Sequence, residues 1–103
     1  MNHYPQGSLV QFQNIFRDIN GFAVDPTVVT FALKAGQNPS STPITYASAT
    51  TPSVGVIART GVGRYCTWGD ATSISGPLVG KWTSTGAGQA EVEDCVYIDA
   101  ATF

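Results

Sequence analysis

Residues 27–34 read Thr-Val-Val-Thr-Phe-Ala-Leu-Lys, and this stretch decides the fold class. Its larger apolar side chains, Val29, Phe31 and Leu33, fall on every second position. In an extended chain successive side chains point to opposite faces, so these three share one face. The stretch therefore predicts a half-buried β-strand that places Val29, Phe31 and Leu33 in the core.

The rest of the chain shows the same two-residue alternation and no sustained helical stripe of apolar residues. Turn-forming Gly, Pro, Asn and Ser residues separate the alternating segments. Tyr65 is expected to point inward, and Trp82 is expected to be a main anchor of the core. Further strands are expected at residues 9–16, 44–47, 54–59, 64–68, 78–83 and 89–99. About seven short strands at such spacing are typical of an all-β, immunoglobulin-like sandwich of antiparallel strands.

The length and composition favour one domain with one core. The chain has 103 residues, of which 43% are hydrophobic, and a second independent core is hard to fit into that length. We predict an N-terminal arm at residues 1–8, a sandwich domain at 9–99 and a C-terminal tail at 100–103. The arm lacks the basic start and apolar run of a secretory signal, and no stretch approaches the roughly 18 apolar residues of a membrane span. We therefore expect a cytosolic product with no membrane partner.

The charge distribution argues against nucleic acid as a partner. Only 12% of the residues are charged, the formal net charge is -2, and the five basic residues are scattered singly. Nucleic-acid binding requires clustered Lys and Arg to neutralise phosphates. The polar remainder is dominated by Ser, Thr, Gly, Asn and Gln, a surface that often packs against other protein.

Groups that could carry chemistry are few. His3 is the only histidine and lies in the predicted arm, so a Ser-His-Asp or Cys-His arrangement is not expected. Glu91 and Glu93 project from one strand face and could act as acid and base or hold a hard cation. With Asp94 and Asp99 nearby, the favoured interpretation is a solvated edge that resists aggregation. We predict no catalytic residue, no cofactor and no metal site.

The two cysteines, Cys66 and Cys95, are expected to be reduced thiols. A bridge between neighbouring strands is the alternative if the protein meets an oxidising medium.

The chain has more aromatic residues than one small core can hold. Phe31, Tyr65 and Trp82 are assigned to the interior, which leaves several rings for the surface, and aromatic side chains are enriched at interface centres. Sugar binding by stacking on Trp68, Tyr46 or Tyr97 is the competing interpretation. The residues predicted to bind a partner are Tyr4, Pro5, Tyr46, Trp68, Tyr97 and Phe103, with Phe22 as a further aromatic that the core does not hold.

A series of short motifs connects these features to a known family. The motifs are Gly21, Asp25-Pro26-Thr27 leading into Val28-Val29-Thr30-Phe31, Gly63-Arg64-Tyr65, Gly80-Lys81-Trp82-Thr83-Ser84-Thr85-Gly86 and Gln89-Ala90-Glu91. Over most of residues 20–98 the chain resembles the small immunoglobulin-like proteins encoded among the head and tail genes of tailed bacteriophages. Residues 69–77 and the two cysteines depart from the pattern and leave the pairing of the later strands open.

The resemblance implies a non-enzymatic virion structural protein. It would be an accessory or decoration protein on the capsid, or a component of the neck that connects head and tail. Its partners would be other virion proteins. Its copies would form a homo-oligomer or another symmetric multi-copy assembly. Assembly would take place in the host bacterial cytoplasm. Residues 1–8 are the expected attachment element. The alternative function is a carbohydrate or host-surface binding module.

Overall fold

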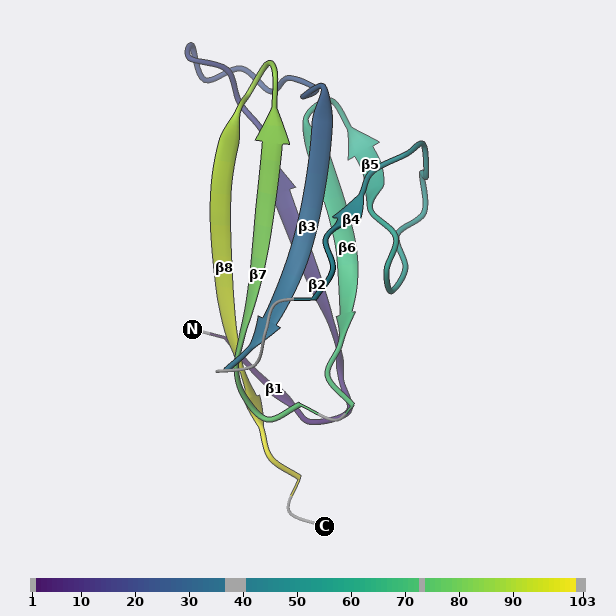
Figure 1. Cartoon of the computed structure of the whole chain (residues 1–103), viewed down its shortest axis with the longest axis vertical. Coiled ribbons are helices and arrows are strands. Elements are labelled where there is room, and N and C mark those ends of the chain that lie inside the picture. The colour runs from purple at the N-terminus through teal and green to yellow at the C-terminus, as the bar shows by residue number, and fades with distance from the viewer. Residues whose placement is uncertain (1, 37–40, 73, 102–103) are drawn as a thin grey trace.

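The computed structural model describes residues 2–36, 41–72 and 74–101. These residues form eight strands and confirm the all-β prediction (Figure 1). None of them lies in a helix long and apolar enough to cross a membrane. The strands, in chain order, are β1 (Asn2–Pro5), β2 (Leu9–Ile15), β3 (Val28–Ala35), β4 (Ile44–Thr45), β5 (Ala58–Gly61), β6 (Arg64–Asp70), β7 (Gly76–Thr85) and β8 (Ala90–Asp99).

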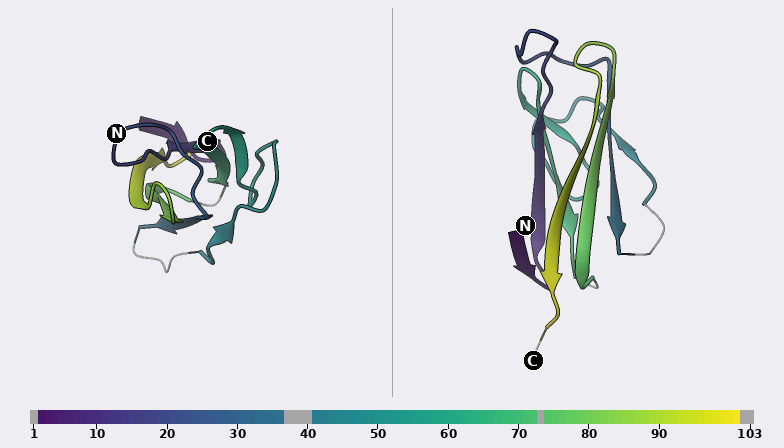
Figure 2. Two further views of the ribbon diagram at one scale, coloured as in Figure 1. Left: turned by 90° about the horizontal axis from the view of Figure 1, so that it is seen from above. Right: turned by 90° about the vertical axis from the view of Figure 1, so that its left-hand side faces the viewer.

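The strands make two sheets that face each other in a sandwich-like arrangement (Figure 2). One sheet has five strands in the order β1-β8-β7-β3-β4, and the other has three in the order β2-β6-β5. Neighbouring strands are antiparallel except β1 and β8, which run parallel. The strand that decides the fold class is β3, and it pairs with β7 along its whole length.

Residues 2–5, expected to precede the sandwich as an arm, form its edge strand β1. They pair in register with Val96–Asp99 of β8, and the ring of Tyr4 packs against the core. Asn2, His3 and Pro5 are exposed. Because only one of the four residues faces the core, the sequence of this segment shows no apolar alternation. Ala100 and Ala101, expected to belong to a tail, are exposed and follow the end of β8.

Two expected strands differ from those observed. The segment 44–47 yields only the two residues of β4, and the segment 54–59 yields a strand that starts at Ala58. Ser53 and Val56 close a turn around Gly55, whose φ of +77° places it in the left-handed region. Val54 and Val56 therefore flank a turn, because the backbone reverses where the alternation predicted an extended chain, whereas Ile57 is buried in the core.

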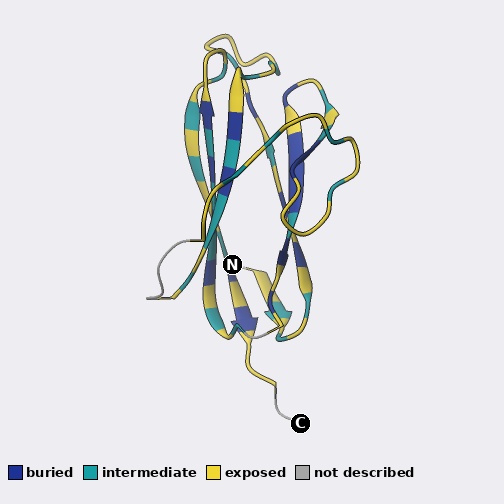
Figure 3. Cartoon of the chain, turned by 45° about the vertical axis from the view of Figure 1, so that its right-hand side comes forward, coloured by how far each residue is buried: buried dark blue, intermediate teal, exposed yellow. Residues whose placement is uncertain are grey.

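The core combines aromatic and aliphatic side chains from both sheets, and Figure 3 shows the buried positions alternating with exposed ones along the strands. Trp82 of β7 is fully buried, and Phe31 of β3 lies beside it with ring centroids 4.7 Å apart. Phe12 of β2 meets Phe31 at 5.2 Å, and Phe16 meets Trp82 at 6.3 Å. The inward positions expected for Tyr65 and Trp82 are confirmed, and Leu33 is half-buried against the same cluster. The indole Nε1 of Trp82 has no hydrogen-bond partner among the described residues.

Gly80 makes room for this cluster in the middle of β7. A Cβ atom at this position would lie 2.7 Å from Cζ of Phe31 and 2.8 Å from Cδ1 of Phe12. Both neighbours are rings fixed by the surrounding core, so neither has an easy way to move aside. The glycine therefore permits phenyl rings from the two sheets to meet above the β7 backbone.

We expect Gly80→Ala to lower the free energy of unfolding by about 1–3 kcal/mol, the usual cost of overpacking a core. Urea denaturation followed by tryptophan fluorescence would measure the change. Thr85→Ala, at an exposed position of the same strand, should stay within about 0.5 kcal/mol of the parent. Equal stabilities of the two variants would contradict the packing role of Gly80.

Candidate interaction surface

Three predicted partner-binding residues lie where β1 meets β8. Tyr4 is half-buried against the core, Pro5 is exposed, and Tyr97 is 38% exposed on the outer face of the five-stranded sheet. The ring of Tyr97 lies 5.1 Å from that of His3, and His3 Nδ1 is 3.1 Å from Asp99 Oδ1. Pro5 and Tyr97 are thus available to a partner, whereas Tyr4 serves mainly as a core residue.

Tyr46 and Trp68, two further predicted partner-binding residues, lie away from the β1–β8 edge and contact different groups. Tyr46 packs edge-on against Tyr65 with ring centroids 5.1 Å apart. Trp68 is half-buried and lines an apolar cleft of about 200 Å³ together with Phe31 and Leu33 of β3. The structure therefore does not place Tyr46, Trp68 and Tyr97 on one stacking platform. The remaining predicted residue, Phe103, lies outside the described residues.

The acidic residues of β8 are solvated. Glu91 and Glu93 are both exposed, and Glu91 Oε1 lies 3.6 Å from Nζ of Lys81 on the neighbouring strand. In the described ranges no group of three or more His, Cys, Asp or Glu side chains is placed to hold a metal ion.

Cys66 and Cys95 are free thiols on different sheets. Cys66 lies in β6 and is buried, and this burial raises the pKa of its thiol. Cys95 lies in β8 and is half-buried.

One polar cluster that the sequence did not predict joins the loops at one end of the sandwich. The Asp25 carboxylate accepts hydrogen bonds from Arg59 Nε and Nη2 at 2.9 and 2.8 Å. It also accepts the backbone N–H of Gly63 at 2.9 Å and the hydroxyl of Tyr65 at 3.2 Å. The hydrogen bond from Arg59, followed by that from Gly63, lowers the pKa of Asp25 to about 2. Burial and the Asp25 charge raise the pKa of Tyr65 to about 12, so its hydroxyl keeps the proton that it donates.

Gly63 brings the β5–β6 turn against the loop that connects β2 and β3. Its φ is +70°, and an added Cβ would lie 2.7 Å from the carbonyl oxygen of Phe16 and 2.9 Å from the backbone nitrogen of Val24. The carbonyl of Gly63 accepts the N–H of Phe16 at 2.8 Å. Backbone packs directly on backbone here, which a larger residue would prevent.

The segment from Arg17 to Ala23 forms a closed loop at this end. Asp18 Oδ1 accepts the backbone N–H groups of Asn20 and Phe22 at 2.9 and 3.0 Å, and Arg17 Nη1 donates to the carbonyl of Gly21 at 3.0 Å. This bonding fixes a loop whose apolar side chains point into solvent. Ile19 is 100% exposed, Phe22 is 68% exposed, and Val62 in the neighbouring β5–β6 turn is 54% exposed. We call these three residues the apolar tips.

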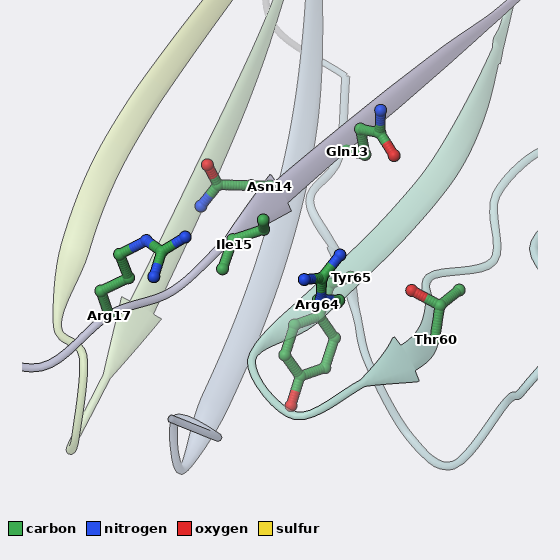
Figure 4. A pocket seen from close by; sticks show the side chains of 7 residues that line it. All are labelled: Gln13, Asn14, Ile15, Arg17, Thr60, Arg64 and Tyr65. Carbon is green, nitrogen blue, oxygen red and sulfur yellow. The ribbon is translucent and has the colours of Figure 1, made fainter. Parts of the chain in front are cut away.

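A polar hollow of about 460 Å³ lies along the end of β2 and is completed by Arg17 of this loop and by residues of the β5–β6 hairpin (Figure 4). The sequence predicts neither the hollow nor the apolar tips, although it places Phe22 outside the expected core. The side chains that line the hollow include Gln13, Asn14, Ile15, Arg17, Thr60 and Arg64.

No protein-family model, curated protein or solved structure matches this chain. Its function is therefore inferred from its own residues.

We expect the stabilising contribution of Asp25 to disappear in acid. Because its pKa is lowered from 3.8 to about 2 in the folded state, the carboxylate favours folding above pH 3.8 and loses this effect as the pH falls through about 2. The difference in unfolding free energy between the parent and Asp25→Asn, measured by urea denaturation, should therefore shrink over this interval. Arg59→Gln removes the largest cause of the shift and should raise the lower limit of the interval. A difference that stays constant across the acid range would contradict this role.

The two thiols should differ in reactivity. In the folded protein we expect iodoacetamide to modify Cys95 first, because Cys66 is 4% exposed and the thiolate is the reacting form. Mass spectrometry of peptides after timed labelling would locate the modified residue. Labelling in urea is the control and should reach both residues, whereas equal rates in the folded protein would contradict the burial of Cys66.

Proposed function

We propose that this chain is an immunoglobulin-like structural protein of a tailed bacteriophage particle, attached in several copies to the capsid or the neck. Its role would be binding without catalysis, and it would assemble with other virion proteins in the host cytoplasm. The sequence motifs and the strand order support this proposal. In immunoglobulin domains strands B, E and D share one sheet, while G, F, C and C′ share the other. The sheets β2-β6-β5 and β8-β7-β3-β4 fit these two orders, with β1 as an additional edge strand beside β8.

The apolar tips are the observation that carries the proposal of a binding role. Ile19 and Phe22 expose large apolar side chains to water, and neither residue belongs to the core. Exposed apolar groups that lie together mark interaction sites, and a central aromatic often supplies much of the binding energy. The apolar tips therefore favour a protein partner at the loop end of the sandwich.

The hydrogen bonds of the loop support the same surface. Association costs conformational entropy when a loop has to be ordered, and a loop that is already fixed avoids part of that cost. Asp18 and Arg17 hold the backbone on both sides of Ile19. Repeated weak contacts of this kind gain strength when several copies attach to one symmetric particle.

The charged edge of β8 favours the loop end over strand addition at that edge. β1 pairs with β8 only at residues 96–99, which leaves the earlier half of β8 at the sheet edge in the described part of the chain. Glu91, Glu93 and Asp94 are exposed along that half, and charged side chains discourage pairing with another strand. The segment 1–8, expected as the attachment element, would contribute through the exposed Pro5 while β1 stays in the sheet.

A carbohydrate or host-surface binding module remains the alternative function. Its strongest structural support is the apolar cleft beside Trp68, where one ring is accessible. The separation of Tyr46, Trp68 and Tyr97 provides no extended stacking surface, and this makes the alternative the less supported one.

We expect the purified chain to co-sediment with phage particles that lack it, and Ile19→Ser combined with Phe22→Ser to weaken this binding about 10-fold or more. Loss of a central aromatic contact typically costs about 2 kcal/mol. Gradient centrifugation with quantification of the bound chain would measure the effect. Leu9→Ser removes an exposed apolar residue of β2 and should leave binding unchanged. A parent chain that does not bind particles would refute the proposed function.

A further inference from the structure

The arginines that line the polar hollow have no carboxylate partner in the described part of the chain. Arg59 forms its ion pair with Asp25, and Lys81 lies near Glu91. Arg17 and Arg64 take part in no ion pair between described residues, yet both line the same hollow (Figure 4). In a chain with a formal net charge of -2, this hollow is a local concentration of positive charge.

The other lining side chains add hydrogen-bond donors. Gln13 and Asn14 contribute amide groups and Thr60 a hydroxyl, while none of the described residues that line the hollow is acidic. A guanidinium has five N–H donors, and the bond from Arg17 Nη1 to the carbonyl of Gly21 leaves others for a ligand. Ile15, 38% exposed, adds an apolar contact at the same place.

Two carboxylates at this end of the molecule, those of Asp18 and Asp25, already have hydrogen-bond partners of their own. Asp18 is bonded to the backbone of its own loop, and Asp25 is bonded to Arg59, Gly63 and Tyr65. The hollow thus combines two available guanidinium groups with neutral donors. Carboxylates suit this set best, because arginine binds them through paired, charge-assisted hydrogen bonds.

We propose that the hollow binds carboxylate side chains from an acidic segment of a partner protein. This inference rests on the proposed function and specifies the chemistry of the surface that meets the loop end. Phe22 lies in the same loop as Arg17, which lines the hollow, so one partner surface can bury Phe22 and place acidic residues in the hollow. A protein segment fits better than an acidic glycan, because Tyr65 supplies the only aromatic ring among the described residues that line the hollow, and it is 2% exposed and offers no face for stacking.

A short blocked oligoglutamate peptide and its oligoglutamine counterpart test the site on the isolated chain. In titrations followed by amide NMR, the glutamate peptide should shift the signals of Gln13, Asn14 and Arg64 and should bind more weakly as salt is added. The glutamine peptide should produce no comparable shifts. Arg64→Gln should weaken glutamate binding about threefold to tenfold, the range expected from loss of one charge-assisted contact.

Arg17→Gln should weaken binding as well, but it also removes the bond to Gly21, so Arg64→Gln is the decisive variant. Lys34→Gln is the matched control, since Lys34 is exposed and does not line the hollow, and it should leave binding unchanged. Equal binding of the two peptides would overturn the inference, and so would unaltered binding by Arg64→Gln. Binding of oligogalacturonate in place of the peptide would overturn it in favour of a glycan site. Because the titration contains no phage particle, its failure refutes the carboxylate site alone, whereas failure of the chain to bind particles refutes the proposed function.

Discussion

The contact of Phe12, Phe31 and Trp82 around Gly80 is the constraint on which the rest of the molecule depends. It joins the two sheets through rings from β2, β3 and β7, and it leaves no space for a side chain at Gly80 itself. Phe16 extends the cluster from Trp82 to Tyr65, with ring centroids 5.7 Å apart in the second contact. Tyr65 then links the apolar interior to the loop end, because its ring is buried and its hydroxyl is bonded to Asp25.

The loop end is therefore held in place by contacts that lead back to the core. Asp25 ties the β2–β3 connection to β5 and to the β5–β6 turn, and Gly63 brings the two backbones into direct contact. The apolar tips and the hollow lie on this fixed base. Binding groups carried on loops above a rigid sandwich can keep a defined geometry while the strands beneath them satisfy the backbone. The charged edge of β8, by contrast, is suited to remaining unpaired.

Local periodicity in the sequence was sufficient to predict most of the strands and several core residues. Val29 and Phe31 fall on one face of their strand, and both are buried as the alternation requires, while Val28 is exposed. β1 was missed because three of its four residues face solvent and only Tyr4 reaches the core. The Asp25 cluster was inaccessible to such reasoning, since its partners Arg59, Gly63 and Tyr65 are separated from it by 34, 38 and 40 residues. The contact of Tyr46 with Tyr65 was equally inaccessible, since the two rings come from positions that local periodicity does not relate.

The parallel pairing of β1 with β8 has a practical consequence for joining this domain to other polypeptides. Pro5 lies opposite Asp99, so the chain passes from β1 into β2 at the same end of the sheet where β8 finishes. The N-terminal strand starts partway along β8, and the C-terminal residues leave from the end opposite to the β5–β6 turn (Figure 1). A fusion partner, fluorescent label or surface tether attached after β8 would consequently leave on the side opposite to the apolar tips. One attached before β1 would instead extend toward the loop end, because β1 runs parallel to β8 and away from that end. The C-terminal side is therefore the suitable point for immobilising the domain with its loop end unobstructed.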